Sequence, residues 1–113
     1  CIAKEFNEHK YLCDTHTAVA VSVYEDYAKR TGDTTPTVIA STANPFKFSK
    51  AVLDAVRPGM TENLDEFEMV TALHDETGEV CPPQLANLKG KTPRFTGCCR
   101  KEDMEQVVFD LLK

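Results

Sequence analysis

Residues 35–48 read TPTVIASTANPFKF, and this stretch decides the fold that we expect. Its β-branched run, TVI, is typical of a short buried strand. Ser41 and Thr42, two small hydroxyl side chains, end that run. Asn44 then suits the cap of a helix, and Pro45 suits its first position. The stretch therefore predicts a strand that leads directly into a helix N-terminus.

This junction is a candidate ligand site. An open α/β sheet binds ligands at the carboxyl ends of its strands, and the free N–H groups of a helix N-terminus attract acceptor groups. Ser41 and Thr42 would lie at that position. Serine and threonine hydroxyls also commonly stabilise turns, so the same two residues could simply complete one. The residues alone leave both interpretations open.

The remaining sequence is dominated by helical patterns. Apolar residues recur at helical spacing, and Gly32 and Gly78 stand where helices commonly end. Helices or helical turns are expected over residues 1–10, 18–30, 45–56, 64–77, 84–88 and 104–112. A strand between helices predicts an α/β fold, mostly helical with one clear strand, in which that strand belongs to a parallel sheet. One strand is too little sheet for a complete domain, so the sequence predicts a partial parallel-sheet fragment.

Composition limits the class of partner. The net charge is −5 and the acidic residues are scattered, which argues against binding to nucleic acid or to an anionic membrane. No apolar run approaches the roughly 20 residues of a membrane span. The five cysteines are irregularly spaced, which favours reduced thiols and a cytoplasmic location. Cys81, Cys98, Cys99 and His74 lack the spacing of metal ligands, so we expect no metal site.

Two blocks of sequence resemble a known family. Residues 11–20 read YLCDTHTAVA, and with residues 35–48 they resemble the C-terminal part of threonine synthase. In that family the first block typically reads D-P-H-T-A-V, and the second reads S-T-A-H-P-A-K-F or S-T-A-x-P-x-K-F. Thr15 stands here in place of the proline, and Asn44 in place of the common histidine. The resemblance covers about residues 9–57.

The resemblance implies a pyridoxal-phosphate enzyme of the tryptophan-synthase β-like fold, also called fold type II. Threonine synthase is a lyase of threonine biosynthesis that converts O-phosphohomoserine and water into threonine and phosphate. Thr42 matches the family hydroxyl that hydrogen-bonds the pyridine nitrogen of the cofactor, and Ser41 is the second candidate for this cofactor-binding role. The resemblance places the Schiff-base lysine and most of the cofactor site upstream, so no catalytic residue is expected within this sequence.

The start of the chain agrees with a fragment, because Cys1 enters a helical pattern without a cap. We expect residues 1–113 to be a C-terminal fragment that depends on the remainder of the enzyme chain and is inactive alone. Within it, residues 1–60 would form an α-β-α core segment, and residues 61–113 a helical C-terminal extension. A different pyridoxal-phosphate lyase, such as threonine dehydratase, and a non-catalytic α/β interaction module are the alternatives.

Other polar residues have ordinary structural explanations. Lys47 lies between two phenylalanines but sits in a first helical turn, where a lysine normally extends to solvent. His16 could contact substrate or phosphate, or could cap or pack at the start of a helix. His74 is expected to be a partly buried structural histidine on a helix face. Cys98 and Cys99 adjoin a basic pair, but ordinary loop or packing roles are expected for them.

Overall fold

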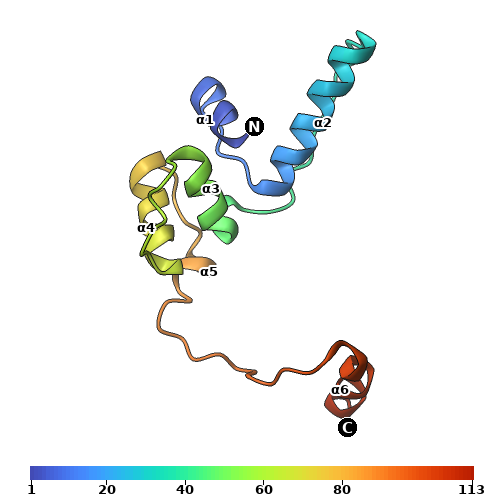
Figure 1. Ribbon diagram of the computed structural model, residues 1–113, viewed down its shortest axis with the longest axis vertical. Helices are drawn as coiled ribbons and strands as arrows, with labels where there is room; N and C mark the ends of the chain where they lie inside the picture. Colours follow the sequence, from blue (N-terminus) through green and yellow to red (C-terminus); the bar gives the residue numbers. More distant parts are fainter.

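Helices form all of the regular structure in the computed structural model, which describes residues 1–113 (Figure 1). In chain order the elements are α1 (Ile2–His9), α2 (Thr15–Thr31), the 3-10 helix η1 (Pro45–Phe48), α3 (Ser49–Val56), α4 (Glu66–Thr77), α5 (Pro83–Ala86), the 3-10 helix η2 (Lys101–Asp103) and α6 (Met104–Leu111). The helices expected from the sequence are therefore confirmed, although the first turn of the helix after Asn44 is 3-10.

The predicted strand is absent, and the expectation of an α/β fold with a partial parallel sheet is wrong for this chain. Residues 37–41 form no regular structure, and Val38, expected to be buried, is 95% exposed. A β-branched run favours extended backbone, but a strand also needs a neighbouring strand to accept and donate its backbone hydrogen bonds. No other segment of residues 1–113 is a strand, so the run has no pairing partner.

Local signals set the helix ends. The buried Asp14 caps α2, and α2 ends at Gly32, whose φ of 71° lies in the left-handed region that glycine adopts without strain. Asp65 caps α4 in a capping box: its side chain accepts the backbone N–H of Glu68, and the Glu68 side chain accepts the backbone N–H of Asp65. Asn44 caps η1 through the backbone N–H of Phe46, as the sequence predicts.

A small apolar core holds the middle of the molecule together. Helix α3 packs against both α1 and α4, and its Val52 and Leu53 are completely buried, as is Leu73 of α4. Phe46 of η1 and Ile2 of α1 complete the contact between these elements. Figure 1 shows α1, α3, α4 and α5 gathered in one cluster. The segment that follows Thr42 is thereby anchored to a packed element.

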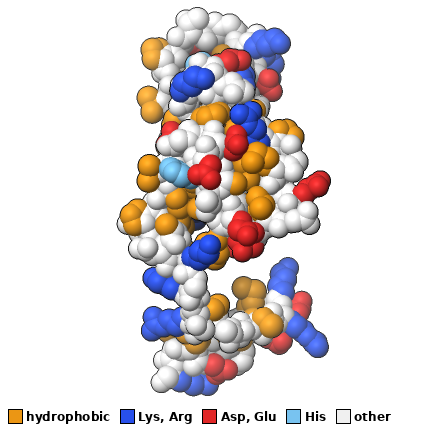
Figure 2. Space-filling model, turned by 90° about the vertical axis from the view of Figure 1, so that its left-hand side faces the viewer, with side chains coloured by type: hydrophobic (Ala, Val, Ile, Leu, Met, Phe, Trp, Pro, Cys, Tyr) orange, Lys and Arg blue, Asp and Glu red, His pale blue; other side chains and the backbone are white.

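The rest of the chain extends away from this cluster. The radius of gyration is 18.5 Å, against about 13 Å for a compact chain of this length. Only 12 of the 113 residues are buried. Figure 1 shows α2 projecting from the cluster and α6 at the end of a long connection. Much apolar surface is consequently exposed, and Figure 2 shows such side chains on both the helix cluster and the C-terminal region.

The exposed apolar side chains of α2 and α6 include Val19, Val23, Tyr27, Met104, Val108, Phe109 and Leu111. Burial of a large apolar side chain stabilises a fold by about 1.5–3 kcal/mol, and these two helices gain little of that from the present chain. None of the helices combines the length and the apolar character that a membrane span requires.

Candidate functional site

The start of α2 is organised around a buried carboxylate. Asp14 is 0% exposed, and its Oδ1 accepts the backbone N–H groups of His16 at 2.8 Å and of Thr17 at 3.4 Å. The Thr17 hydroxyl donates a hydrogen bond to Oδ2 of the same carboxylate. All these donors lie within three residues of Asp14. The buried charge is thus stabilised by the helix that it caps.

These hydrogen bonds also determine the protonation of Asp14. Burial by itself raises the pKa of a carboxyl group, but hydrogen bonds from the Thr17 hydroxyl and from the backbone and ring of His16 lower it more. The pKa of Asp14 therefore lies below its ordinary value of 3.8. Asp14 is a carboxylate at neutral pH and can act only as an acceptor.

His16 joins the two sequence blocks. Its Nδ1 lies 3.1 Å from Oδ1 of Asp14, and since the carboxylate can only accept, Nδ1 carries the proton. The imidazole ring packs edge-on against Phe48, with ring centroids 4.9 Å apart and an interplanar angle of 60°. This packing joins the DTHTAV block to the end of the second block. The contacts of His16 within this chain are thus structural, while its side chain remains exposed.

The two blocks meet a second time through hydroxyl groups. The Thr17 Oγ1 atom and the Ser41 Oγ atom are hydrogen bonded at 3.1 Å, across 24 positions of sequence. The structure therefore brings Ser41, a candidate from sequence, next to Thr17 and Asp14, which sequence reasoning did not select. The spacing of Asp14 and Thr17, an N-cap and its third following residue, was the available signal.

Thr42 has a different environment from Ser41. Its side chain is exposed and makes no hydrogen bond within residues 1–113, and it lines none of the hollows of the surface. Of the two candidate hydroxyls, Ser41 is engaged within the chain and Thr42 is available to a group outside it.

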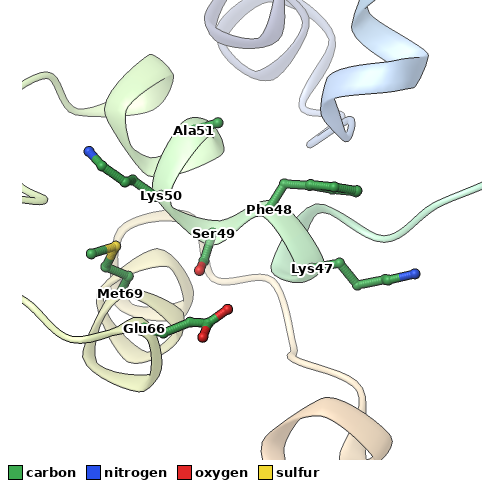
Figure 3. Close-up of a pocket in the computed structure, with 7 residues that line it drawn as sticks. All are labelled: Lys47, Phe48, Ser49, Lys50, Ala51, Glu66 and Met69. Carbon is green, nitrogen blue, oxygen red and sulfur yellow. The ribbon is translucent and has the colours of Figure 1, made fainter. Parts of the chain in front are cut away.

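A hollow of about 400 Å³ lies between α3 and α4, close to η1 (Figure 3). Its lining comprises Lys47, Phe48, Ser49, Lys50, Ala51, Glu66 and Met69. Figure 3 shows the Ser49 hydroxyl on the side of Glu66, whereas the Lys47 and Lys50 side chains point in opposite directions. The two ammonium groups therefore do not converge on a common ligand. Lys47 is exposed, as its place in a first helical turn predicts.

The remaining candidates lie apart from this region. His74 is exposed rather than partly buried, and its Nδ1 donates a hydrogen bond of 2.6 Å to the carbonyl of Glu79 beyond the end of α4. Cys98 and Cys99 are free, exposed thiols in the connection to α6. Burial raises the pKa of the Cys81 thiol. No three His, Cys, Asp or Glu side chains are grouped so that they could hold a metal ion.

Comparison with known proteins identifies the family to which the chain belongs. A family model described as "Threonine synthase, C-terminal" matches residues 17–108, which is most of the chain. The chain therefore belongs to the threonine synthase C-terminal family. The match includes Thr17, Ser41 and Thr42 and continues through α4, α5 and most of α6, well beyond the two blocks that carry the sequence resemblance. No curated protein matches the chain.

The family is one of pyridoxal-phosphate-dependent lyases, so the function of the chain is threonine synthase-like. This assignment agrees with the resemblance of residues 11–20 and 35–48.

The lowered pKa of Asp14 leads to a prediction about acid stability. Because the folded pKa lies below that of the unfolded chain, Asp14 contributes its full stabilisation above about pH 4 and loses it as the pH falls through the folded pKa. We expect the free energy of unfolding, measured with urea between pH 2 and pH 6, to fall less steeply toward acid in Asp14→Asn than in the original chain. Parallel pH profiles of the two proteins would contradict this assignment.

Proposed function

We propose that this chain is the C-terminal part of a threonine synthase, which converts O-phosphohomoserine and water into threonine and phosphate. The family match over residues 17–108 supports this proposal most directly. The contacts between the two sequence blocks, Thr17 with Ser41 and His16 with Phe48, agree with it. The substrate would be a small molecule, and the rest of the enzyme chain would be the macromolecular partner.

The availability of Thr42 is compatible with a contact to the cofactor. Pyridoxal phosphate supplies an electron sink for negative charge that develops on the substrate. A threonine hydroxyl can donate a hydrogen bond to the ring nitrogen and leaves that nitrogen without a formal charge, which moderates the electron sink. A free, exposed hydroxyl at Thr42 meets the chemical requirement for such a donor. We therefore assign the ring-nitrogen contact to Thr42 rather than to Ser41.

The packing supports different roles for the two parts of the chain. Residues 1–60 would hold Thr42 at the cofactor, because η1 and α3, which follow Thr42, anchor the C-terminal side of its segment to the core. Residues 61–113 would be a helical extension, in which α4 stabilises α3. The exposed apolar faces of α2 and α6 would pack against the rest of the enzyme.

Replacing Thr42 by valine in the enzyme that contains this chain tests the assignment. Valine keeps the shape of the side chain but leaves the ring nitrogen without a donor, which costs about 1–3 kcal/mol. We expect the Kd for pyridoxal phosphate to rise roughly 5- to 150-fold, with a change in the visible absorbance of the bound cofactor. Both quantities can be measured by titrating the apoenzyme.

Two matched variants serve as controls. Thr42→Ser keeps the hydroxyl and should retain cofactor affinity. Thr34→Val, on the same segment, removes an exposed hydroxyl that makes no hydrogen bond, and it should leave cofactor affinity unchanged. An unchanged Kd and spectrum in Thr42→Val would overturn the assignment. The same result is expected if the chain is a non-catalytic interaction module. Phosphate release from O-phosphohomoserine distinguishes threonine synthase from a dehydratase that acts on threonine.

A further inference from the structure

We propose that Thr17 and Asp14 are positioning residues for the cofactor contact of Thr42, and that they act through Ser41. This inference rests on the proposed function. It concerns two residues of α2 and its cap that do not themselves contact the cofactor, and it gives Ser41 a role different from that of Thr42.

The first observation is that a single hydrogen bond holds the Thr42 end of its segment to α2. Residues 34–43 make no backbone–backbone hydrogen bond. Their side-chain hydrogen bonds link neighbours along the segment, with one exception. That exception is the bond between Ser41 and Thr17, the only hydrogen bond that connects residues 34–43 to a distant element. Tyr27 of α2 holds the start of the segment through Asp33, which in turn accepts hydrogen bonds from Thr35. The position of the Thr42 end next to α2 therefore depends on the bond between Ser41 and Thr17.

The second observation is the direction of the hydrogen bonds. The Asp14 carboxylate can only accept, so the Thr17 hydroxyl uses its single O–H to donate a hydrogen bond to Asp14. The Thr17 oxygen then has only lone pairs to offer, and the Ser41 hydroxyl must be the donor in the bond at 3.1 Å. Protons thus point from Ser41 to Thr17 and from Thr17 to Asp14. The proton of Ser41 is not free for another acceptor while this arrangement holds.

The third observation is that the hydrogen bonds from Ser41 to Thr17 and from Thr17 to Asp14 end at the capped N-terminus of α2. Asp14 is completely buried, Thr17 is buried as well, and both belong to the capped N-terminus of α2. Thr42 follows Ser41 directly, so their Cα atoms are about 3.8 Å apart. Fixing Ser41 against α2 limits the positions that the Thr42 hydroxyl can reach. A group that contacts a cofactor ring requires positioning to within about 0.5 Å.

Two substitutions each remove one partner of the hydrogen bond between Thr17 and Ser41. Thr17→Val keeps the shape of a buried side chain but removes the hydroxyl, and Ser41→Ala removes the donor from an exposed residue. In the complete enzyme we expect both to lower kcat on the order of 10- to 100-fold, the effect of a small misplacement, with the KM for O-phosphohomoserine nearly unchanged. The visible absorbance of the bound cofactor should shift in the same direction as in Thr42→Val.

Conservative variants separate positioning from general stability. Thr17→Ser keeps the hydroxyl and should restore both the absorbance and kcat. Thr71→Val makes the same substitution on α4, where the hydroxyl bonds only to the carbonyl of Phe67, and should change neither. The melting temperature of each variant is measured in parallel. If Thr17→Val does not fold, Ser41→Ala decides the outcome, because it removes an exposed hydroxyl only.

The outcomes distinguish this inference from the proposed function. Normal absorbance and kcat in Ser41→Ala, together with a defect in Thr42→Val, would overturn the positioning role and leave the cofactor contact in place. Normal behaviour of Thr42→Val would overturn the cofactor contact itself. Matching defects in Thr17→Val, Ser41→Ala and Thr42→Val, with rescue by Thr17→Ser, would support both.

Discussion

The 113-residue chain, supplied with pyridoxal phosphate and O-phosphohomoserine, is expected to release no phosphate above the background rate. Pyridoxal-phosphate enzymes bind their cofactor through a lysine, and such a lysine becomes nucleophilic when desolvation lowers its pKa. Every lysine of this chain is exposed, including Lys47 next to two phenylalanines. The chain also leaves Thr42 outside any hollow, so it offers no enclosed site around that hydroxyl.

Colorimetric determination of inorganic phosphate measures this directly. The longer enzyme that we propose to contain the chain is the positive control, and a reaction without protein gives the background. Turnover by the 113-residue chain alone would show that one of its exposed lysines can serve as the Schiff-base residue, and it would contradict the assignment of that residue to another part of the enzyme.

Replacement of Leu53 by alanine is expected to have the largest effect on stability. Leu53 is 0% exposed in α3, the helix that packs against both α1 and α4. Leucine-to-alanine substitutions in a packed core cost about 2–5 kcal/mol, because apolar contact is lost and a cavity remains. A fold with only 12 buried residues has few other contacts to compensate. The expected result is a large loss of helix content without denaturant.

Circular dichroism during urea titration measures this loss. Val38→Ala is the matched control, since Val38 is 95% exposed and a surface substitution changes stability by about 0.5 kcal/mol or less. Equal transition midpoints for Leu53→Ala and Val38→Ala would show that α3 does not hold the helix cluster together.

The helices were predictable because their signals are local. Asp14 and Gly32 bound α2, and Asn44 begins the turn that leads into α3, as capping chemistry requires. The strand was not predictable in the same way. The run at residues 37–39 has strand propensity, but pairing depends on a second segment, and this chain contains none. Propensity is a weaker guide for strands because a strand is stabilised by its neighbours.

For the candidate site, too, the sequence supplied the candidate residues and the tertiary structure supplied their contacts. The resemblance of residues 35–48 selected Thr42 first and Ser41 second for the cofactor contact, but gave Ser41 no other role. The role of Ser41 came from a contact across 24 residues, in which Thr17 engages Ser41 and leaves Thr42 free. His16 and Phe48 likewise meet only in three dimensions.

The sequence by itself determined the helices, the Asn44 cap, the terminal glycines Gly32 and Gly78, and the family, because each depends on residues close together in the chain or on motifs within it. Only the tertiary structure decided that residues 37–41 form no strand, that α3 is the centre of the core and that Ser41 is bound to α2. The physical reason is that backbone pairing, burial and side-chain hydrogen bonds across 24 residues all depend on which distant segments meet.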